Sequence, residues 1–256
     1  AGGPKSGPPV LPLESTNGVW RTMEKKTVYL LCGLLCDAEV WTEQAAALSA
    51  QHEVRIVSFQ GFDTLGAMAE HVLAKAPARF ALAGHSMGGR VALEVYRRAA
   101  ARVERLALLD TGYEPASPGE DARRYALVNK AEAEGIDAVA RLWGEPMVAP
   151  CNRARVLDRV CAMVGRMSPE IYAKQTRALL SRPDASDVLG MIACPTLVLC
   201  GAQDEWSPPQ RHERMQALIP GSWMTVIDDC GHMCTMERPA QVIDALADWL
   251  SRAEHP

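Results

Sequence analysis

Three side chains that together can cleave an acyl bond occur along the chain in the order Ser86, Asp204, His232. A serine hydroxyl becomes a good nucleophile when a histidine removes its proton, and a third group must hold that histidine in one tautomer. Each of the three residues lies in a loop directly after an apolar run of strand character. Because parallel strands end at the same edge of a sheet, we expect the three side chains to meet there. The pattern predicts acyl transfer to Ser86, with His232 as the base and Asp204 as the residue that orients it.

The serine lies in residues 84–89, Gly-His-Ser-Met-Gly-Gly, which contain the G-x-S-x-G pattern of a sharp turn between a strand and a helix. That pattern alone also occurs in ordinary loops. Here residues 79–83 have strand character, and residues 90–96 carry apolar side chains at helical spacing. Gly84 and Gly88 remove side chains that would collide in so tight a turn. We therefore expect the serine hydroxyl to be exposed at the start of the helix.

Acyl transfer also needs hydrogen-bond donors for the negative oxygen of its tetrahedral intermediate. The backbone N–H of Met87, at the start of the helix after the serine, is one candidate. The second donor should come from the loop after the first long strand, and by position it is the N–H of Leu34, next to Gly33. The sequence therefore predicts an oxyanion hole formed by Leu34 and Met87.

The base and the acid of this set both have competitors. Of the six histidines, His232 is the one found late in the chain in a loop after a strand, whereas His85 is expected to pack against and shape the serine turn. Asp110 also ends a strand and competes with Asp204 for the role of the acid. We prefer Asp204 because its loop, residues 201–205 (Gly-Ala-Gln-Asp-Glu), resembles the turn that usually carries the acid. Asp110 is then expected to tether the entrance to the segment that follows it.

The elements that must position these residues alternate between strand and helix, which predicts a doubly wound, mostly parallel sheet. The expected strands are residues 27–31, 54–57, 79–83, 106–110, 195–201 and 224–227, and the expected helices between and after them include 38–50, 63–75, 208–219 and 239–251.

The alternation breaks in residues 113–191, where helical patterns occur at 122–133, 136–143, 154–166 and 169–180 without a strand. We expect this segment to form a helical cap over a core made of residues 19–112 and 192–256. Residues 1–18 are rich in Gly and Pro and lack the apolar middle of a signal peptide, which is typical of a disordered arm or a cloning remnant. Side chains of the cap that could line an apolar substrate pocket are Trp143, Met147, Met163, Met167 and Tyr172, about half of which we expect only to pack the cap onto the sheet.

Composition and charge restrict the class of partner. With 256 residues, 48% hydrophobic and 23% charged, the chain can bury a large core. A net charge of -4 gives no reason to expect nucleic acid or an anionic membrane surface as a partner, and no apolar run is long enough to span a membrane. The eight cysteines form no C-x-x-C pair, so we expect free thiols, no metal site and a cytoplasmic location. A homo-oligomer is compatible with the sequence.

Four motifs taken together resemble the α/β-hydrolase superfamily, in the branch of small bacterial esterase-like hydrolases with a helical cap. They are residues 84–89, residues 108–111 (Leu-Leu-Asp-Thr), residues 201–204 (Gly-Ala-Gln-Asp) and residues 230–233 (Cys-Gly-His-Met), and the resemblance covers about residues 27–252. It implies the α/β-hydrolase fold, a Ser86 that is acylated, a His232 that carries the proton, an Asp204 that orients it, and no cofactor. One departure is Cys32-Gly33, where the family usually has His-Gly and uses that histidine to brace the oxyanion loop.

The resemblance leads us to expect a serine hydrolase that cleaves a carboxylic ester of a small or medium apolar substrate. The same triad serves thioesterases, C–C bond hydrolases, proline iminopeptidases, lactonases and perhydrolases, so these activities are alternatives. A dehalogenase or an epoxide hydrolase is disfavoured, because those enzymes attack with Asp and position 86 is Ser. An alternative of another class is a ligand-binding receptor with this fold and no catalysis, against which the intact triad argues.

Overall fold

Six strands pair side by side in parallel, in the order β4-β3-β5-β6-β7-β8. The computed structural model describes residues 15–16, 19–20 and 25–252. The strands are β3 (Thr27–Leu31), β4 (Glu53–Val57), β5 (Phe80–His85), β6 (Val103–Leu109), β7 (Thr196–Gly201) and β8 (Trp223–Ile227). All residues of the central strands β5 and β7 are buried, because these strands are covered on both faces, whereas the edge strands β4 and β8 are partly exposed. The predicted doubly wound parallel sheet is confirmed.

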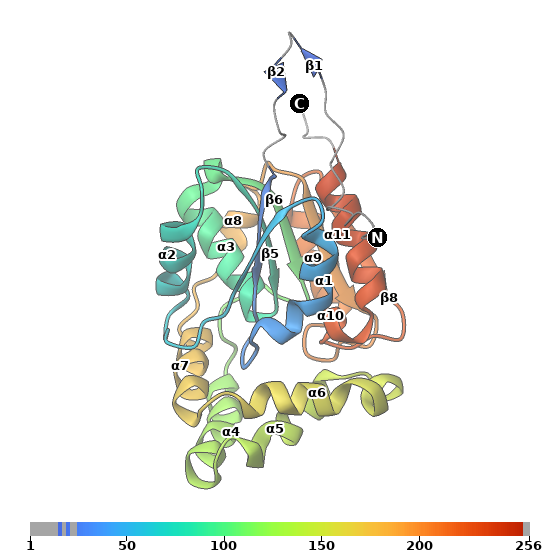
Figure 1. Ribbon diagram of the computed structural model, residues 1–256. Coiled ribbons are helices and arrows are strands. Elements are labelled where there is room, and N and C mark those ends of the chain that lie inside the picture. Colours follow the sequence, from blue (N-terminus) through green and yellow to red (C-terminus); the bar gives the residue numbers. More distant parts are fainter. Residues whose placement is uncertain (1–14, 17–18, 21–24, 253–256) are drawn as a thin grey trace, which may run out of the picture.

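Helices cover both faces of this sheet (Figure 1). Helices α2 and α3 pack together on one side, and α1 and α11 pack together on the other. The helical elements outside the insertion are η1 (Ala38–Trp41), α1 (Thr42–Leu48), α2 (Leu65–Lys75), α3 (Met87–Ala99), η2 (Ala100–Arg102), α9 (Pro209–Leu218), α10 (Cys234–Glu237) and α11 (Pro239–Ser251). Local signals set several of their starts: Thr64 caps α2 by accepting the N–H of Ala67, and prolines open α9 and α11.

The chain between β6 and β7 is helical, as expected. Figure 1 shows α4, α5 and α6 together beyond one end of the sheet. The inserted elements are α4 (Glu120–Glu134), α5 (Asp137–Gly144), η3 (Glu145–Met147), η4 (Pro150–Asn152), α6 (Arg153–Gly165), α7 (Pro169–Leu180) and α8 (Ser186–Leu189). The four longest lie within two residues of the predicted bounds, while the short α8 was not predicted.

Strand β6 begins three residues before its predicted start and ends one residue before Asp110. The early start escapes a sequence pattern because Glu104 and Arg105 look like exposed residues. In the structure Arg105 is buried, and its Nη1 donates to the carbonyl of Trp249 at 3.3 Å. Asp110 leaves the strand with φ of 46°, so the chain turns sharply there.

Near the N-terminus, Ser15–Thr16 (β1) pairs with Val19–Trp20 (β2) in an antiparallel manner. The prediction for residues 1–18 otherwise lies outside the described residues.

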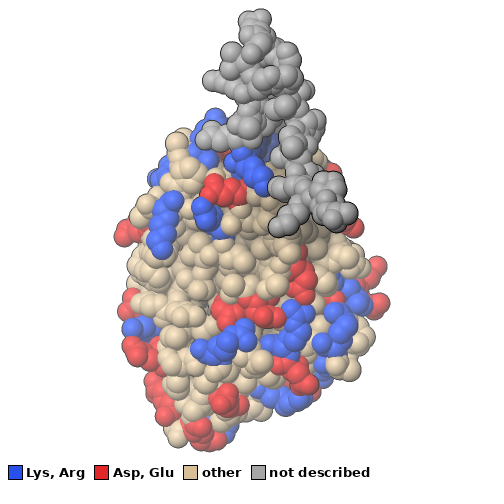
Figure 2. All heavy atoms as spheres, viewed as in Figure 1, with Lys and Arg blue, Asp and Glu red and all other residues tan. Residues whose placement is uncertain are grey.

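All eight cysteines are free thiols. No helix among the described residues has the length and apolar character needed to cross a bilayer. On the face seen in Figure 2, acidic and basic side chains lie beside one another rather than in separate patches.

Candidate active site

Ser86 occupies a strained turn between β5 and α3. Its backbone has φ 54° and ψ −117°, a conformation that L-residues rarely adopt. Glycine is required on both sides of it, because a Cβ at Gly84 would collide with the backbone of Gly88, and a Cβ at Gly88 would collide with the carbonyl of Leu31. The turn thus brings α3 close to β3 and presents the serine at the carboxyl edge of the sheet.

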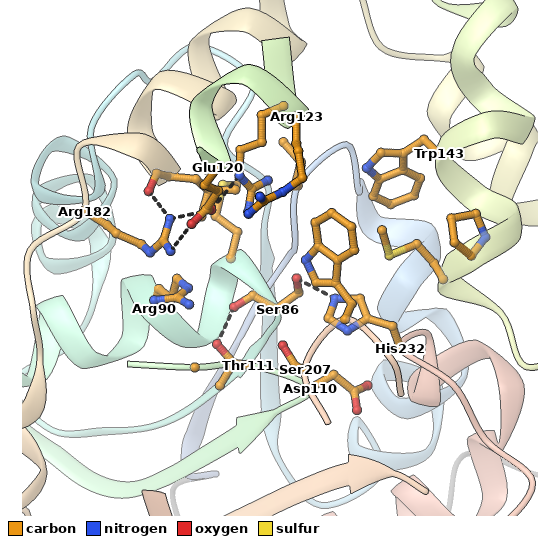
Figure 3. Close-up of a pocket in the computed structure, with 18 of the residues that line it drawn as sticks. Ser86, Arg90, Asp110, Thr111, Glu120, Arg123, Trp143, Arg182, Ser207 and His232 are labelled. Atoms are coloured by element: carbon orange, nitrogen blue, oxygen red, sulfur yellow. Dashed lines mark hydrogen bonds and ion pairs between the residues drawn. The ribbon is translucent and has the colours of Figure 1, made fainter. Parts of the chain in front are cut away.

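The three side chains singled out in the sequence meet at this edge. The hydroxyl Oγ of Ser86 lies 2.9 Å from Nε2 of His232, and Nδ1 of His232 lies 2.9 Å from Oδ2 of Asp204 (Figure 3 shows Ser86 and His232). The other carboxylate oxygen of Asp204 accepts the backbone N–H groups of Trp206 and Ser207 at 2.9 and 2.8 Å. These bonds fix the carboxylate, which in turn fixes the imidazole ring with Nε2 toward the serine.

His232 and Asp204 each stabilise the charged form of the other. Burial favours the neutral form of Asp204, but the charge and hydrogen bond of His232 and the N–H of Ser207 outweigh it and hold the pKa of Asp204 below its usual value. Burial likewise favours neutral His232, yet Asp204 raises the pKa of the imidazole above its ordinary 6.5. The arrangement therefore stabilises the imidazolium that forms when His232 takes a proton.

Asp110, the competing acid, makes no hydrogen bond to His232. Its carboxyl is fully buried and accepts the N–H of Gly201 at 3.0 Å and the N–H of Cys234 at 3.2 Å. Burial raises its pKa well above the usual range, which favours the protonated acid. Asp110 thus fastens the end of β6 to β7 and α10, rather than to the inserted helices as the sequence suggested.

His85 serves as a support for the site. Its Nε2 lies 2.8 Å from the carbonyl oxygen of His232, so a protonated Nε2 donates to the backbone of the candidate base. Burial, with a further contribution from the charge of His232, lowers the pKa of His85 to about 4. His85 is therefore neutral at neutral pH and shapes the site, in line with the packing role expected for it.

The loop after β3 carries Leu34, which borders the same cavity as Ser86 and Met87. This loop is braced by Gln175 of α7, whose Oε1 accepts the N–H of Leu35 at 2.9 Å. Cys32, at the position where the family usually has histidine, instead donates its Sγ–H to the carbonyl of Asp37 at 3.3 Å. Burial raises the pKa of this thiol well above its usual value, so it remains a neutral donor. Gln175 was not predicted, because it lies within a helix of the insertion and belongs to no motif that indicates a contact with the loop after β3.

A cavity of about 590 Å³ opens above Ser86 and His232. Of the five predicted pocket residues, Trp143, Met147 and Tyr172 line it. Met163 and Met167 do not line it, because Met163 lies on the buried face of α6 and Met167 is buried in the turn after that helix. The exposed side chains of Leu142 and Trp206 border the same cavity.

A charged wall is also part of the cavity lining, and the predicted pocket residues include none of its side chains. The charged side chains that line the cavity include Arg90, Glu114, Glu120, Arg123, Arg124, Arg182, Glu205 and Arg211. Figure 3 shows Arg90 and Arg182 on one side of Ser86 and Trp143 on the other. The position of Arg90, one helical turn after the serine, was the available signal for this wall. No group of His, Cys, Asp and Glu side chains within the described part of the chain is placed to hold a metal ion.

Comparisons with known proteins agree with this architecture. RutD of Klebsiella pneumoniae (strain 342), a protein designated a carbamate hydrolase, is 29% identical over 231 residues, or 82% of this chain and 85% of that protein. A malate-bound thermophilic esterase from Thermogutta terrifontis is 29% identical with a TM-score of 0.81, over 90% of this chain and 91% of that one. The enol-lactonase of Burkholderia xenovorans LB400 is 25% identical with a TM-score of 0.81, over 94% and 100%. Residues 28–245 match the model of the alpha/beta hydrolase family, and the chain belongs to that family.

Proposed function

We propose that this protein is a serine hydrolase that cleaves a carboxylic ester of a small or medium-sized substrate through an acyl-enzyme on Ser86. One observation carries the proposal: Ser86, His232 and Asp204 form a continuous hydrogen-bonded chain with 2.9 Å at each step. The likeness to an esterase and to an enol-lactonase supports it.

In the first half of the reaction, Oγ of Ser86 bonds to the carbonyl carbon of the ester while Nε2 of His232 takes the hydroxyl proton. The carbonyl oxygen becomes an oxyanion, for which the N–H groups of Met87 and Leu34 are the proposed donors. Each such donor is worth about 3 kcal/mol in the transition state. When the intermediate collapses, the bond to the alcohol oxygen breaks and the imidazolium of His232 returns its proton to that oxygen.

In the second half, water attacks the acyl-enzyme. Nε2 of His232 takes a proton from the water as its oxygen bonds to the acyl carbon, and the second intermediate collapses with Oγ as the leaving group. The imidazolium then protonates Oγ, so the free acid leaves and Ser86 is restored. Asp204 stays ionised throughout and stabilises the imidazolium in both halves.

Residues 113–191 serve as the cap of this proposed enzyme, and residues 19–112 and 192–256 as its core. Trp143 and Met147, from the cap, face the cavity that Ser86 and His232 enter from the core. A cavity of about 590 Å³ lies within the range that binds small organic ligands and leaves no room for a folded partner. The substrate is therefore a small molecule.

Lactone opening is the second candidate, favoured by the likeness to an enol-lactonase over 94% of this chain. A lactone is a cyclic ester, so the steps above apply, except that the alcohol remains joined to the acyl group until water releases both. Lactones therefore belong in the same substrate panel as open-chain esters.

The test is ester turnover by the wild-type protein and by Ser86→Ala. A panel of p-nitrophenyl esters of increasing acyl length, with a lactone, a thioester, a diketone and a prolyl amide, reports which bond is cleaved fastest. We expect an ester or a lactone to lead, and Ser86→Ala to lower kcat by about a millionfold with the fold intact by circular dichroism. Ester cleavage that survives the substitution would refute the proposal.

A further inference from the structure

Arg90 is a cation in the cavity wall that lacks an anionic partner. Its side chain is mostly buried and borders the same cavity as Ser86. Among the described residues, its one hydrogen bond runs from Nη1 to the backbone carbonyl of Glu114 at 2.8 Å, and no carboxylate lies within ion-pair distance. Burial lowers the pKa of Arg90 to about 9, and the charges of Arg182 and Arg211 lower it further, while those of Glu114 and Glu120 act in the opposite direction. The guanidinium therefore remains charged at neutral pH, and neither glutamate is close enough to form an ion pair with it.

The carboxylates nearby are committed to other arginines. Glu120 accepts two hydrogen bonds of 2.8 Å from Arg182 and a third of 2.7 Å from Arg124. Glu114 lies 3.4 Å from Nε of Arg211. Both carboxylates therefore face arginines other than Arg90.

The charge of the whole wall is positive. Five arginines and three glutamates line the cavity, and the remaining acid, Asp110, is held toward its protonated form. Arg123 contributes to this excess but is exposed to solvent, and its hydrogen bond among the described residues is a 3.5 Å contact with the hydroxyl of Ser117. Arg90 is mostly buried and has no ion pair, and a buried cation is costly unless an anion compensates it.

The backbone leaves space for this guanidinium. A Cβ at position 112 would lie 2.9 Å from Nη2 of Arg90 and 2.9 Å from Cδ of Arg211, so Gly112 is the residue that lets both side chains occupy this corner. Figure 3 places Arg90 to one side of Ser86, while Trp143 stands on the opposite side. A substrate that spans the serine would therefore touch a cation at one end and an aromatic ring at the other.

We infer that the substrate is an ester that carries a carboxylate, bound by the guanidinium of Arg90, with its apolar part against Trp143. This inference rests on the proposed function, and it replaces the apolar substrate expected from the sequence with an ester that carries one negative charge. A guanidinium fits a carboxylate through two parallel hydrogen bonds. A single negative charge matches the one buried cation of the lining that forms no ion pair.

The test compares esters that differ only in this charge. In the first pair the carboxylate is on the acyl side: the monomethyl ester of adipic acid is compared with its neutral amide, the methyl ester of adipamic acid. In the second pair the carboxylate is on the alcohol side: the butanoate ester of glycolic acid is compared with that of glycolamide. For at least one pair, the wild-type protein should have a kcat/KM for the acid at least about tenfold above that for the amide, as expected for one hydrogen bond to a charged group.

The variants assign that preference to a residue. Arg90→Met should bring the ratio of kcat/KM values to about one, and Arg90→Lys should restore part of it. Arg141→Met is the matched control, since Arg141 pairs with exposed Asp158 and does not line the cavity, and it should keep the wild-type ratio. Equal rates for acid and amide in both pairs, or a preference that survives Arg90→Met, would overturn the inference.

Failure of the proposed function gives a different result. If both amide esters are cleaved in a Ser86-dependent manner without preference for the acids, the serine hydrolase stands and the anionic substrate falls. If no ester is cleaved, binding of the adipate and adipamate esters to Ser86→Ala is measured by tryptophan fluorescence, since Trp143 and Trp206 line the cavity. If Ser86→Ala binds the acid more tightly than the amide, and the Ser86→Ala, Arg90→Met double variant does not, the result supports the anion site independently of the proposed function. Equal binding of the two ligands contradicts it.

Discussion

The side-chain amide of Gln175 holds the loop of the candidate oxyanion hole: its Oε1 accepts the N–H of Leu35 at 2.9 Å, across 140 positions of the chain. Its Nε2 donates to the carbonyl of Phe59 at 2.9 Å, so the amide is fixed at both ends and fully buried. Leu35 has φ of 57°, a conformation that such an external bond helps to maintain. The loop that carries Leu34 is therefore held by a side chain from an inserted helix, α7.

Replacing Gln175 by Met should therefore affect both stability and turnover. The variant leaves the N–H of Leu35 and the carbonyl of Phe59 buried without partners. Each unpaired group should lower the free energy of unfolding by about 1 to 3 kcal/mol. Since the loop carries the proposed donor Leu34, kcat should fall about tenfold while KM changes less. Steady-state kinetics and urea unfolding measure the two effects.

Gln44→Met provides the control for this prediction. Gln44 is equally buried, and its Nε2 donates to the carbonyl of Thr235 in α10 at 2.9 Å rather than to the loop after β3. It should lower the free energy of unfolding with a much smaller change in kcat. If the two variants lower kcat equally, Gln175 acts through general stability and is not a positioning residue.

Asp204 and Asp110 should differ sharply in their effect on turnover. Asp204→Asn removes the charge that holds His232 and favours the wrong tautomer, so kcat should fall by about 10⁴. Asp110→Asn keeps an oxygen for the N–H of Gly201 or Cys234 and does not touch His232, so its kcat should fall far less. Comparison of the two purified variants on one ester decides between the acids. A larger loss for Asp110→Asn would assign the role to Asp110.

The pH dependence of kcat/KM should report the raised pKa of His232. The base must be neutral to accept the serine proton, so activity falls as pH drops through its pKa. Because Asp204 raises that pKa, the midpoint of the acid limb should lie above 6.5 in the free enzyme. A rate that stays flat from pH 8 down to pH 4 would exclude His232 as the base.

The sequence predicted the sheet and the Ser-His-Asp contact because both follow from strong local patterns. Buried parallel strands are continuous apolar runs, and the loops after them face one edge, so Ser86, Asp204 and His232 could be placed without knowing any contact. Helix orientation is a weaker signal. Met147 and Met163 look alike in sequence and both are buried, yet Met147 lines the cavity and Met163 does not, because the docking of the inserted elements decides which side chains face the cavity.

The charged wall and the Gln175 brace could not be predicted for a related reason. Arg90 follows Ser86 on α3. Its position in the cavity depends on the space left by Gly112, and its lack of an ion pair depends on the pairing of Arg182 and Arg124 with Glu120. These relationships join residues from separate elements, and a single sequence carries no pattern that pairs them.

Covalent labelling shows whether Ser86 is an activated nucleophile. The wild-type protein is treated with a fluorophosphonate, and the modified peptide is identified by mass spectrometry. We expect one label per chain on Oγ of Ser86, with labelling abolished in Ser86→Ala and strongly slowed in His232→Ala. Well-folded wild-type protein that stays unlabelled at Ser86, or carries the label on another residue, would contradict this expectation and favour a receptor that binds its ligand without chemistry.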